Sequence, residues 1–161
     1  GGHINPVATM STGQFEMEPG EIDPYGYVIA AIGFACFTHF YGSIKVSLAR
    51  KRYNINYPKL YAESSDAHSV EFNCVQRAHQ QTLEWLAMCQ LLAAVNGMVF
   101  PKAAAFFLCV WTVGKLLYIH GYSSGKPNGR HFGGMVAHMG DISLVVMSFV
   151  SASKLLGGLI S

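Results

Sequence analysis

The stretch FNCVQRAHQQTLEWLAMCQLLAAVNGMVF, residues 72–100, joins a polar half to an apolar half, with no Pro and no Gly before Gly97. Each residue of a helix advances about 100° around the axis, so Arg77, Gln81 and Glu84 lie on one face. Charge at the mouth of a lipid-spanning helix is costly unless it faces a partner, water or a ligand. This face is therefore the first candidate for a functional site.

Four apolar segments make up most of the chain. Of its 161 residues, 51% are hydrophobic and 12% are charged, which is about half the charged share of a soluble domain. The 21 residues between Asp23 and Lys45 carry no charge, and as a helix they would extend roughly 31 Å, enough to cross a bilayer core. Three further runs are nearly uncharged: 85–101, 103–122 (broken by Lys115) and 131–161 (broken by Asp141 and Lys154). The sequence predicts an all-α, integral-membrane four-helix bundle.

One domain preceded by a short extension is expected at this length. Residues 1–23 form an acidic N-terminal extension without Lys or Arg, and we expect a partner to hold it. Residues 24–161 form the transmembrane domain, with helices at roughly 24–50, 72–98, 102–122 and 132–157. In the first helix, small residues are expected to let neighbouring helices approach closely: Gly26, Gly33 and Gly42.

The basic residues are concentrated in two connections. Lys45, Arg50, Lys51, Arg52 and Lys59 lie at the end of the first helix and in the loop after it, and Lys126 and Arg130 lie between the third and fourth helices. The positive-inside rule places both loops on the cytosolic side of the membrane, or its topological equivalent, and both termini on the other. The polar side chains of different helices gather at this same level. Together they predict a cationic, aromatic-lined pocket for an anionic ligand.

Other classes of protein fit the composition poorly. A net charge of +2 argues against a nucleic-acid partner. The four cysteines include no CxxC pair, which favours buried thiols over a metal site or disulfides. The chain begins with Gly rather than Met, which leaves room for a cleaved organelle presequence.

Three segments carry a family resemblance: FNCVQRAHQQTLE at 72–84, ARKRYNINYPKLYA at 49–62 and LLYIHGYSSGKP at 116–127. They resemble the membrane-associated proteins in eicosanoid and glutathione metabolism, most of all the type-3 microsomal glutathione S-transferases, over about residues 24–157. The resemblance implies a homotrimer that binds glutathione as co-substrate, without metal, between neighbouring protomers. Such proteins conjugate glutathione to lipophilic electrophiles, reduce lipid hydroperoxides or form leukotriene C from an epoxide.

The resemblance also implies roles for single residues. Arg50 and Arg77 match arginines that contact glutathione, and Lys51 stands at another basic position. Glu84 matches the carboxylate that takes the ligand's amino group. The remaining positions carried over are Gln81 in the binding site, Tyr118 and Tyr122 of the third helix, and Arg130 as the nearest candidate for the arginine that activates the thiol.

The chain departs from this pattern at four positions. Gln81 stands where relatives have Asn, Trp85 where a tyrosine is common, Lys115 in place of an Arg, and Gly129 where close relatives have a basic residue. The leading hypothesis is an enzyme of the endoplasmic reticulum or mitochondrial membrane that takes its lipophilic electrophile from the lipids. The departures favour an alternative, a non-catalytic structural subunit of a larger respiratory or photosynthetic membrane complex. A lipid-binding adaptor is a third possibility.

Each candidate residue also has a plainer interpretation. Arg77 and Glu84 could form structural ion pairs, and because they are two turns apart we expect each to pair with a neighbour rather than with the other. Tyr118 and Tyr122 could belong to an interfacial aromatic belt, and Lys115 could extend to the headgroups. His138 and Asp141, at i and i+3, could make a polar contact with another helix or a partner subunit, or relay protons. His79 is expected to be a packing or subunit-contact residue, and His39 is expected to be buried in a helix interface.

Overall fold

The computed structural model describes residues 22–157, which fold into four long helices with no strand in that range. They are α1 (Tyr25–Tyr53), α2 (Ser69–Gly97), α3 (Pro101–Tyr122) and α4 (His131–Leu155), and a short 3₁₀ helix, η1 (Pro127–Arg130), precedes α4. The helix ends lie within three residues of the predicted ones. The acidic extension, which we expected a partner to hold, lies outside the described residues except for Ile22 and Asp23.

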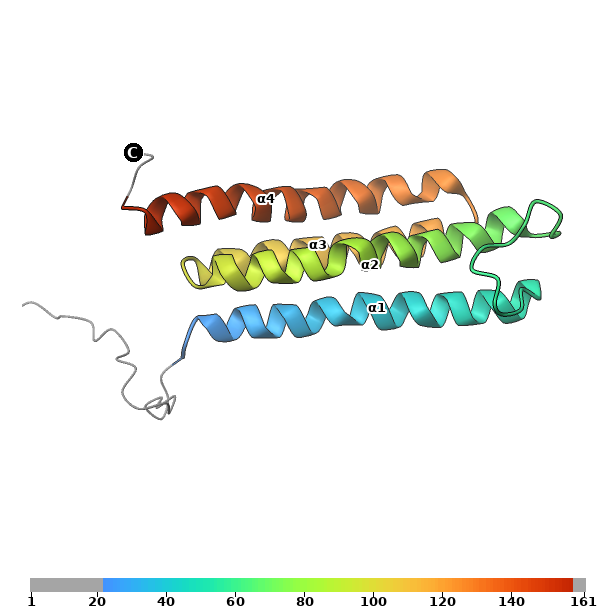
Figure 1. Ribbon diagram of the computed structural model, residues 1–161, viewed down its shortest axis with the longest axis horizontal. Helices are drawn as coiled ribbons and strands as arrows, with labels where there is room; N and C mark the ends of the chain where they lie inside the picture. Colours follow the sequence, from blue (N-terminus) through green and yellow to red (C-terminus); the bar gives the residue numbers. More distant parts are fainter. Residues whose placement is uncertain (1–21, 158–161) are drawn as a thin grey trace, which may run out of the picture.

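The helices run side by side, with α2 and α3 between α1 and α4 (Figure 1). Both basic connections, the loop after α1 and the turn before α4, lie at one end of the bundle. The tight turn between α2 and α3 lies at the other end, together with the start of α1 and the end of α4. The most extensive helix contact is between α3 and α4.

Three segments are long and apolar enough to cross a membrane: α1, α3 and Pro127–Leu155. The second predicted span, α2, is not among them. It carries Glu71, Arg77 and Glu84, and these charges lower its mean hydropathy although the helix runs alongside the other three (Figure 1). Large apolar side chains project outward from the bundle, as in a protein surrounded by lipid: Ile29, Phe37, Phe40, Ile44, Met139, Ile142 and Phe149 among others.

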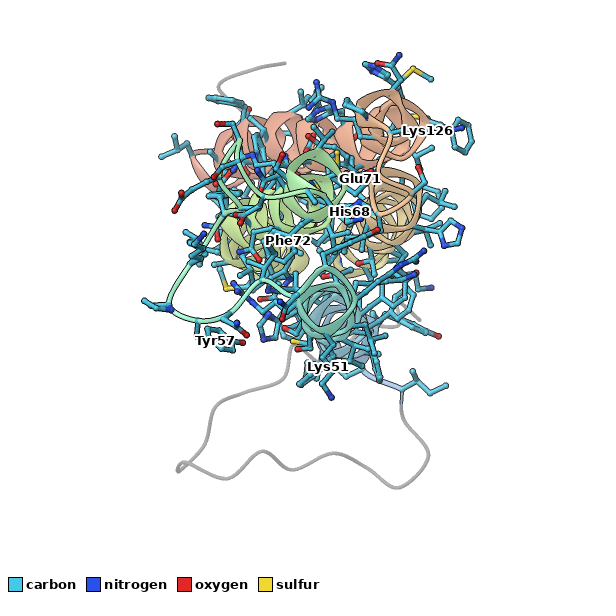
Figure 2. All side chains as sticks on the ribbon, turned by 90° about the vertical axis from the view of Figure 1, so that its right-hand side faces the viewer. Lys51, Tyr57, His68, Glu71, Phe72 and Lys126 are labelled. Carbon is cyan, nitrogen blue, oxygen red and sulfur yellow. The ribbon has the colours of Figure 1, made fainter. Side chains whose placement is uncertain are left out.

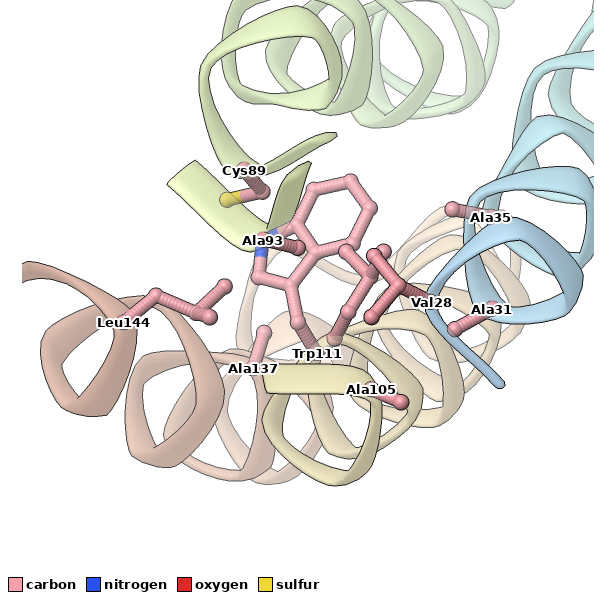
Figure 3. Close-up of a cluster of buried hydrophobic side chains, with 10 residues drawn as sticks. Val28, Ala31, Ala35, Cys89, Ala93, Ala105, Trp111, Ala137 and Leu144 are labelled. Atoms are coloured by element: carbon pink, nitrogen blue, oxygen red, sulfur yellow. The ribbon is translucent and has the colours of Figure 1, made fainter. Parts of the chain in front are cut away.

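The core of the bundle is built from one large side chain among small ones. Trp111 of α3 is fully buried and is surrounded by Val28 and Ala35 of α1, Cys89 and Ala93 of α2, and Ala137 and Leu144 of α4 (Figure 3). Small residues on three helices leave the volume that the indole fills. Truncating such a side chain to alanine typically costs about 3–5 kcal/mol.

Close approach of α3 and α4 depends on glycine. A Cβ at Gly114 would overlap the backbone nitrogen of Ala137, and one at Gly133 would overlap the backbone nitrogen of Tyr118. The two helix backbones are therefore in direct contact, as small residues allow in membrane bundles. This contact sets the position of Tyr118 relative to α4.

The glycines of α1 behave differently from the expectation. A Cβ at Gly26 or Gly33 would meet nothing within 4 Å, so neither residue mediates a helix contact within the protomer. Their faces point away from α2 and α3, which sequence spacing alone could not reveal. Only Gly42 faces another helix, where it packs against the His79 ring. His79 in turn lies 5.3 Å from His39, centroid to centroid, so both histidines belong to the α1–α2 interface.

A polar network fastens α2 to α4 near the other end of the bundle. Asn96 is fully buried, and its Nδ2 donates to the Leu144 carbonyl at 2.9 Å and to Ser148 Oγ at 3.1 Å. Its Oδ1 accepts from Ser151 Oγ at 3.0 Å. All polar atoms of the amide are thus satisfied inside the bundle.

Candidate functional site

A cleft of about 480 Å³ opens at the basic end of the bundle. It is bounded by the loop after α1, the first two turns of α2 and the end of α3. Two residues predicted for the site, Arg77 and Tyr122, line it. The other lining residues are Tyr61, Ala62, Ser64, Ser69, Val70, Asn73 and Cys74.

Asn73 holds the loop over this cleft. Its Oδ1 accepts from the Ala62 backbone N–H at 2.8 Å, and its Nδ2 donates to the Ala62 carbonyl at 2.9 Å. One side chain therefore satisfies both backbone groups of a loop residue, which fixes the loop against α2. Asn73 is one turn before Arg77, on the same face of α2, so the distance from loop to guanidinium is set by the helix itself.

A second set of contacts closes the loop on itself at the solvent side. Asp66 accepts from the Glu63 backbone N–H at 2.8 Å and from Lys59 Nζ at 3.3 Å. The Glu63 N–H, and after it the Lys59 ammonium, lower the pKa of Asp66, while Asp66 followed by Glu63 raises the pKa of Lys59. A lowered carboxyl pKa and a raised amine pKa keep both groups charged throughout the neutral range, and the contacts weaken only in acid or in strong base.

On α2, Arg77 and Glu84 bind each other directly. Arg77 Nη1 donates to Glu84 Oε1 at 2.7 Å, and Nη2 donates to Oε2 at 3.3 Å. The expectation that two turns would keep them apart was wrong. Seven residues rise about 10.5 Å along the axis, and an extended arginine and an extended glutamate span that distance together. The pair is accessible, with side-chain exposures of 43% and 41%.

On α3, the two tyrosines form a continuous aromatic edge toward Arg130. The Tyr118 and Tyr122 rings pack edge to face with centroids 5.7 Å apart. Arg130 donates to the Tyr122 hydroxyl at 3.3 Å, and its guanidinium carbon lies 5.3 Å from the centre of that ring. Both tyrosines are buried, so within the protomer they do not act as an interfacial belt.

Lys115 does not extend to the headgroups. Its side chain is buried, and Nζ donates to Gln81 Oε1 at 2.6 Å. The ammonium also lies 5.1 Å from the Tyr118 ring centre and 5.6 Å from that of Trp111. Lys115 thereby links the polar face of α2 to the aromatic edge of α3.

Gly129 lies where the chain cannot accommodate a side chain. A Cβ at Gly129 would overlap the Gly121 carbonyl oxygen, and a Cβ at Gly121 would overlap that of Gly129. The backbone of η1 thus lies directly on the last turn of α3. The packing around position 129 therefore leaves no room for the basic residue that close relatives have there. Arg130, the next residue, is the cation that reaches Tyr122.

Arg50 and Lys51 lie apart from these residues within the protomer. Arg50 is buried between aromatic rings, with its guanidinium carbon 4.4 Å from the centre of Tyr57 and 5.2 Å from that of Phe72. It donates to the Ile55 carbonyl at 3.4 Å. Seen from the basic end, Lys51 projects from the outer side of α1, away from α2 (Figure 2).

His138 and Asp141 bind each other on α4. His138 Nδ1 lies 3.1 Å from Asp141 Oδ2, and the histidine side chain is half exposed while the aspartate is buried. The pair is therefore bound within α4, and Asp141 also acts electrostatically on Lys115 of α3. The His138 ring also meets the edge of Trp85 at a centroid distance of 6.1 Å.

The sequence prediction missed Tyr61, Asn73 and Cys74 as residues of the cleft. Asn73 and Cys74 lie within the quoted FNCVQRAHQ block, and Asn73 shares a helical face with Arg77. That spacing could have identified Asn73. Nothing in the sequence indicates that the loop folds back over α2, so Tyr61 had no comparable signal.

A model of the MAPEG family matches residues 28–150. The chain belongs to the MAPEG family. The match takes in nearly all of the four helices and both basic connections. Family membership, together with the three long apolar helices, identifies an integral membrane protein. It is also consistent with the glutathione chemistry that the family resemblance implies.

Proposed function

We propose that this MAPEG protein is a membrane-bound glutathione transferase or peroxidase of the type-3 class, acting on lipophilic electrophiles or lipid hydroperoxides. One observation carries the proposal: Gln81, which lies between Arg77 and Glu84 on α2, binds Lys115 of α3. Lys115 in turn lies beside the aromatic edge that leads through Tyr118 and Tyr122 to Arg130. A cleft of about 480 Å³ adjoins both helices. Cations beside aromatic rings suit a ligand with two carboxylates.

In the proposed complex, each charged group has one role. Arg77 binds a carboxylate of glutathione, and its planar fork allows two parallel hydrogen bonds. Glu84 accepts from the ligand's amino group. Arg130, held by the Tyr122 hydroxyl, stabilises the thiolate, which is the nucleophilic form of the thiol. The second substrate reaches the site laterally from the bilayer.

The accessible Arg77–Glu84 pair also supports a homotrimer. An ion pair with exposures of 43% and 41% is costly against lipid, and a second copy of the chain would cover it. Arg50 and Lys51 do not reach this pair within the protomer. In the proposed trimer, Lys51 completes the site from a neighbouring copy, and Arg50 joins it by leaving its place between Tyr57 and Phe72. The membrane of the endoplasmic reticulum or of mitochondria is the proposed location.

The test is a titration and an assay on the protein in lipid nanodiscs. Glutathione binding is measured by calorimetry, and turnover by glutathione-dependent loss of 1-chloro-2,4-dinitrobenzene or of a lipid hydroperoxide. We expect R77A to weaken binding at least about tenfold, the loss of one charge-assisted contact. R52A is the matched control, since exposed Arg52 stacks on Tyr53 outside the cleft, and it should change binding by less than about twofold. Wild-type protein without glutathione binding or turnover overturns the proposal.

A second candidate function is a structural subunit of a larger membrane complex. The contact between Gly121 and Gly129 favours it, because the chain has no room for the basic residue of its relatives at position 129. The particle purified from native membranes discriminates the two. Three copies around an axis support the enzyme, and one copy among unlike subunits supports the scaffold.

A further inference from the structure

Lys115 is a cation in the interior of the bundle. Only 1% of its surface is exposed, yet α3 holds it at a depth where a charge is expensive. Its Nζ donates to Gln81 Oε1 at 2.6 Å, across the α2–α3 interface. The acidic side chains that act on it electrostatically are Asp141 of α4 and Glu84 of α2, and Asp141 is itself buried.

An ammonium group fixes the orientation of the amide that it binds. It has three donors and no acceptor, so only the oxygen of Gln81 can face it. The Nε2 of Gln81 must then point to the other side. It makes no side-chain hydrogen bond to residues 22–157, and Gln81 lies between Arg77 and Glu84 on the accessible face of α2.

From this geometry we propose that Lys115 is a positioning residue that holds Gln81 as an obligate hydrogen-bond donor to a carboxylate of glutathione. The inference rests on the proposed function of the same site. It assigns the lysine a role distinct from charge attraction, because the ammonium is buried behind Gln81 and acts through it. The Gln81 amide and Arg77 then both donate to the same glutathione carboxylate. A neutral ester of that carboxylate no longer offers the charged acceptor that both donors need.

A simple packing role explains the lysine less well. A buried ammonium without function is destabilising relative to an apolar side chain of the same length, and Met at this position would pack against Trp111 at no electrostatic cost. The hydrogen bond of 2.6 Å to Gln81 Oε1 is a contact that Met could not make, so it accounts for a lysine at this buried position.

The experiment measures glutathione affinity in nanodiscs for wild type, K115M, K115R, Q81M and the double variant K115M/Q81M. We expect K115M to weaken binding about tenfold and K115R to restore most of it, since Arg also only donates. In the Q81M background, K115M should add less than about twofold, because its effect passes through the amide. T112V is the matched control: Thr112 is buried on the same face of α3, and within residues 22–157 its hydroxyl bonds only to the Leu108 carbonyl.

The outcomes separate the two proposals. If wild type does not bind glutathione, the proposed function fails. If wild type binds glutathione and K115M has the same affinity as wild type or as the T112V control, the positioning role is wrong. It is also wrong if K115M weakens binding as much in the Q81M background as it does in the wild-type background. Q81E provides a second route where K115M does not assemble, since its carboxylate keeps a partner for Lys115 and lacks the N–H₂ donor. Q81E is expected to assemble and to lose binding, and unchanged affinity overturns the inference.

Discussion

At the scale of single residues, the position of each charge is decided by side-chain reach as much as by helical phase. Arg77 and Glu84 share a face of α2, as their helical spacing predicts, and they also bind each other across two turns. Lys115, by contrast, reaches across to another helix rather than along its own. Helical phase alone therefore identified the face and missed the partners.

Gly129 yields a prediction at this scale. Placing the basic residue of close relatives there, as G129R, forces the backbone of η1 away from Gly121, and overpacking of this kind typically costs about 1–3 kcal/mol. We expect a lower unfolding temperature in detergent and no gain in glutathione turnover. N128R is the control, because it adds the same charge at the neighbouring exposed residue. A stable G129R with increased turnover would contradict this account.

At the scale of elements, the α3–α4 contact is the most constrained part of the bundle. Gly133 and Gly134 are adjacent on α4, yet a Cβ at Gly133 would overlap the Tyr118 backbone, while one at Gly134 would lie at an ordinary 3.6 Å from the Tyr118 ring. The two positions therefore provide a matched pair of substitutions.

We expect G133A to destabilise the protein by about 1–3 kcal/mol, because α3 and α4 must separate. G134A should be neutral or slightly stabilising, since alanine has the higher helix propensity. Thermal unfolding of both variants in the same detergent provides the measurement. Equal unfolding temperatures would show that the helix backbones are not in direct contact.

The elements also show which parts of the fold the sequence could predict. Gaps between charges and the Gly/Pro stop at Gly97 predicted four helices, because hydropathy and helix breakers act locally along the chain. The loop over the cleft, the contact of Lys115 with Gln81 and the glycines that face another helix were not predictable. Each depends on which side of one element meets another, and Gly26 and Gly33 illustrate the error that results.

At the scale of the whole molecule, the concentration of basic residues at one end of the bundle makes a topology prediction. The loops that contain Lys59 and Lys126 lie at one end of the bundle, and Lys102 at the start of α3 lies at the other (Figure 1). In sealed native vesicles, we expect external trypsin to cut after Lys59 from the cytosolic side and to cut after Lys102 only once the membrane is opened. Peptide mapping by mass spectrometry checks this, and simultaneous cleavage at both sites in intact vesicles would contradict it.

The Arg77–Glu84 contact has a consequence for which molecules the protein can exclude. A compound that binds Arg77 must first separate it from Glu84, so a fatty acid, with one negative charge and no ammonium, would leave the glutamate carboxylate without its partner. If the protein binds glutathione as proposed, the arginine and glutamate together would act as a filter against monoanionic amphiphiles and would admit a peptide that brings a compensating cation of its own.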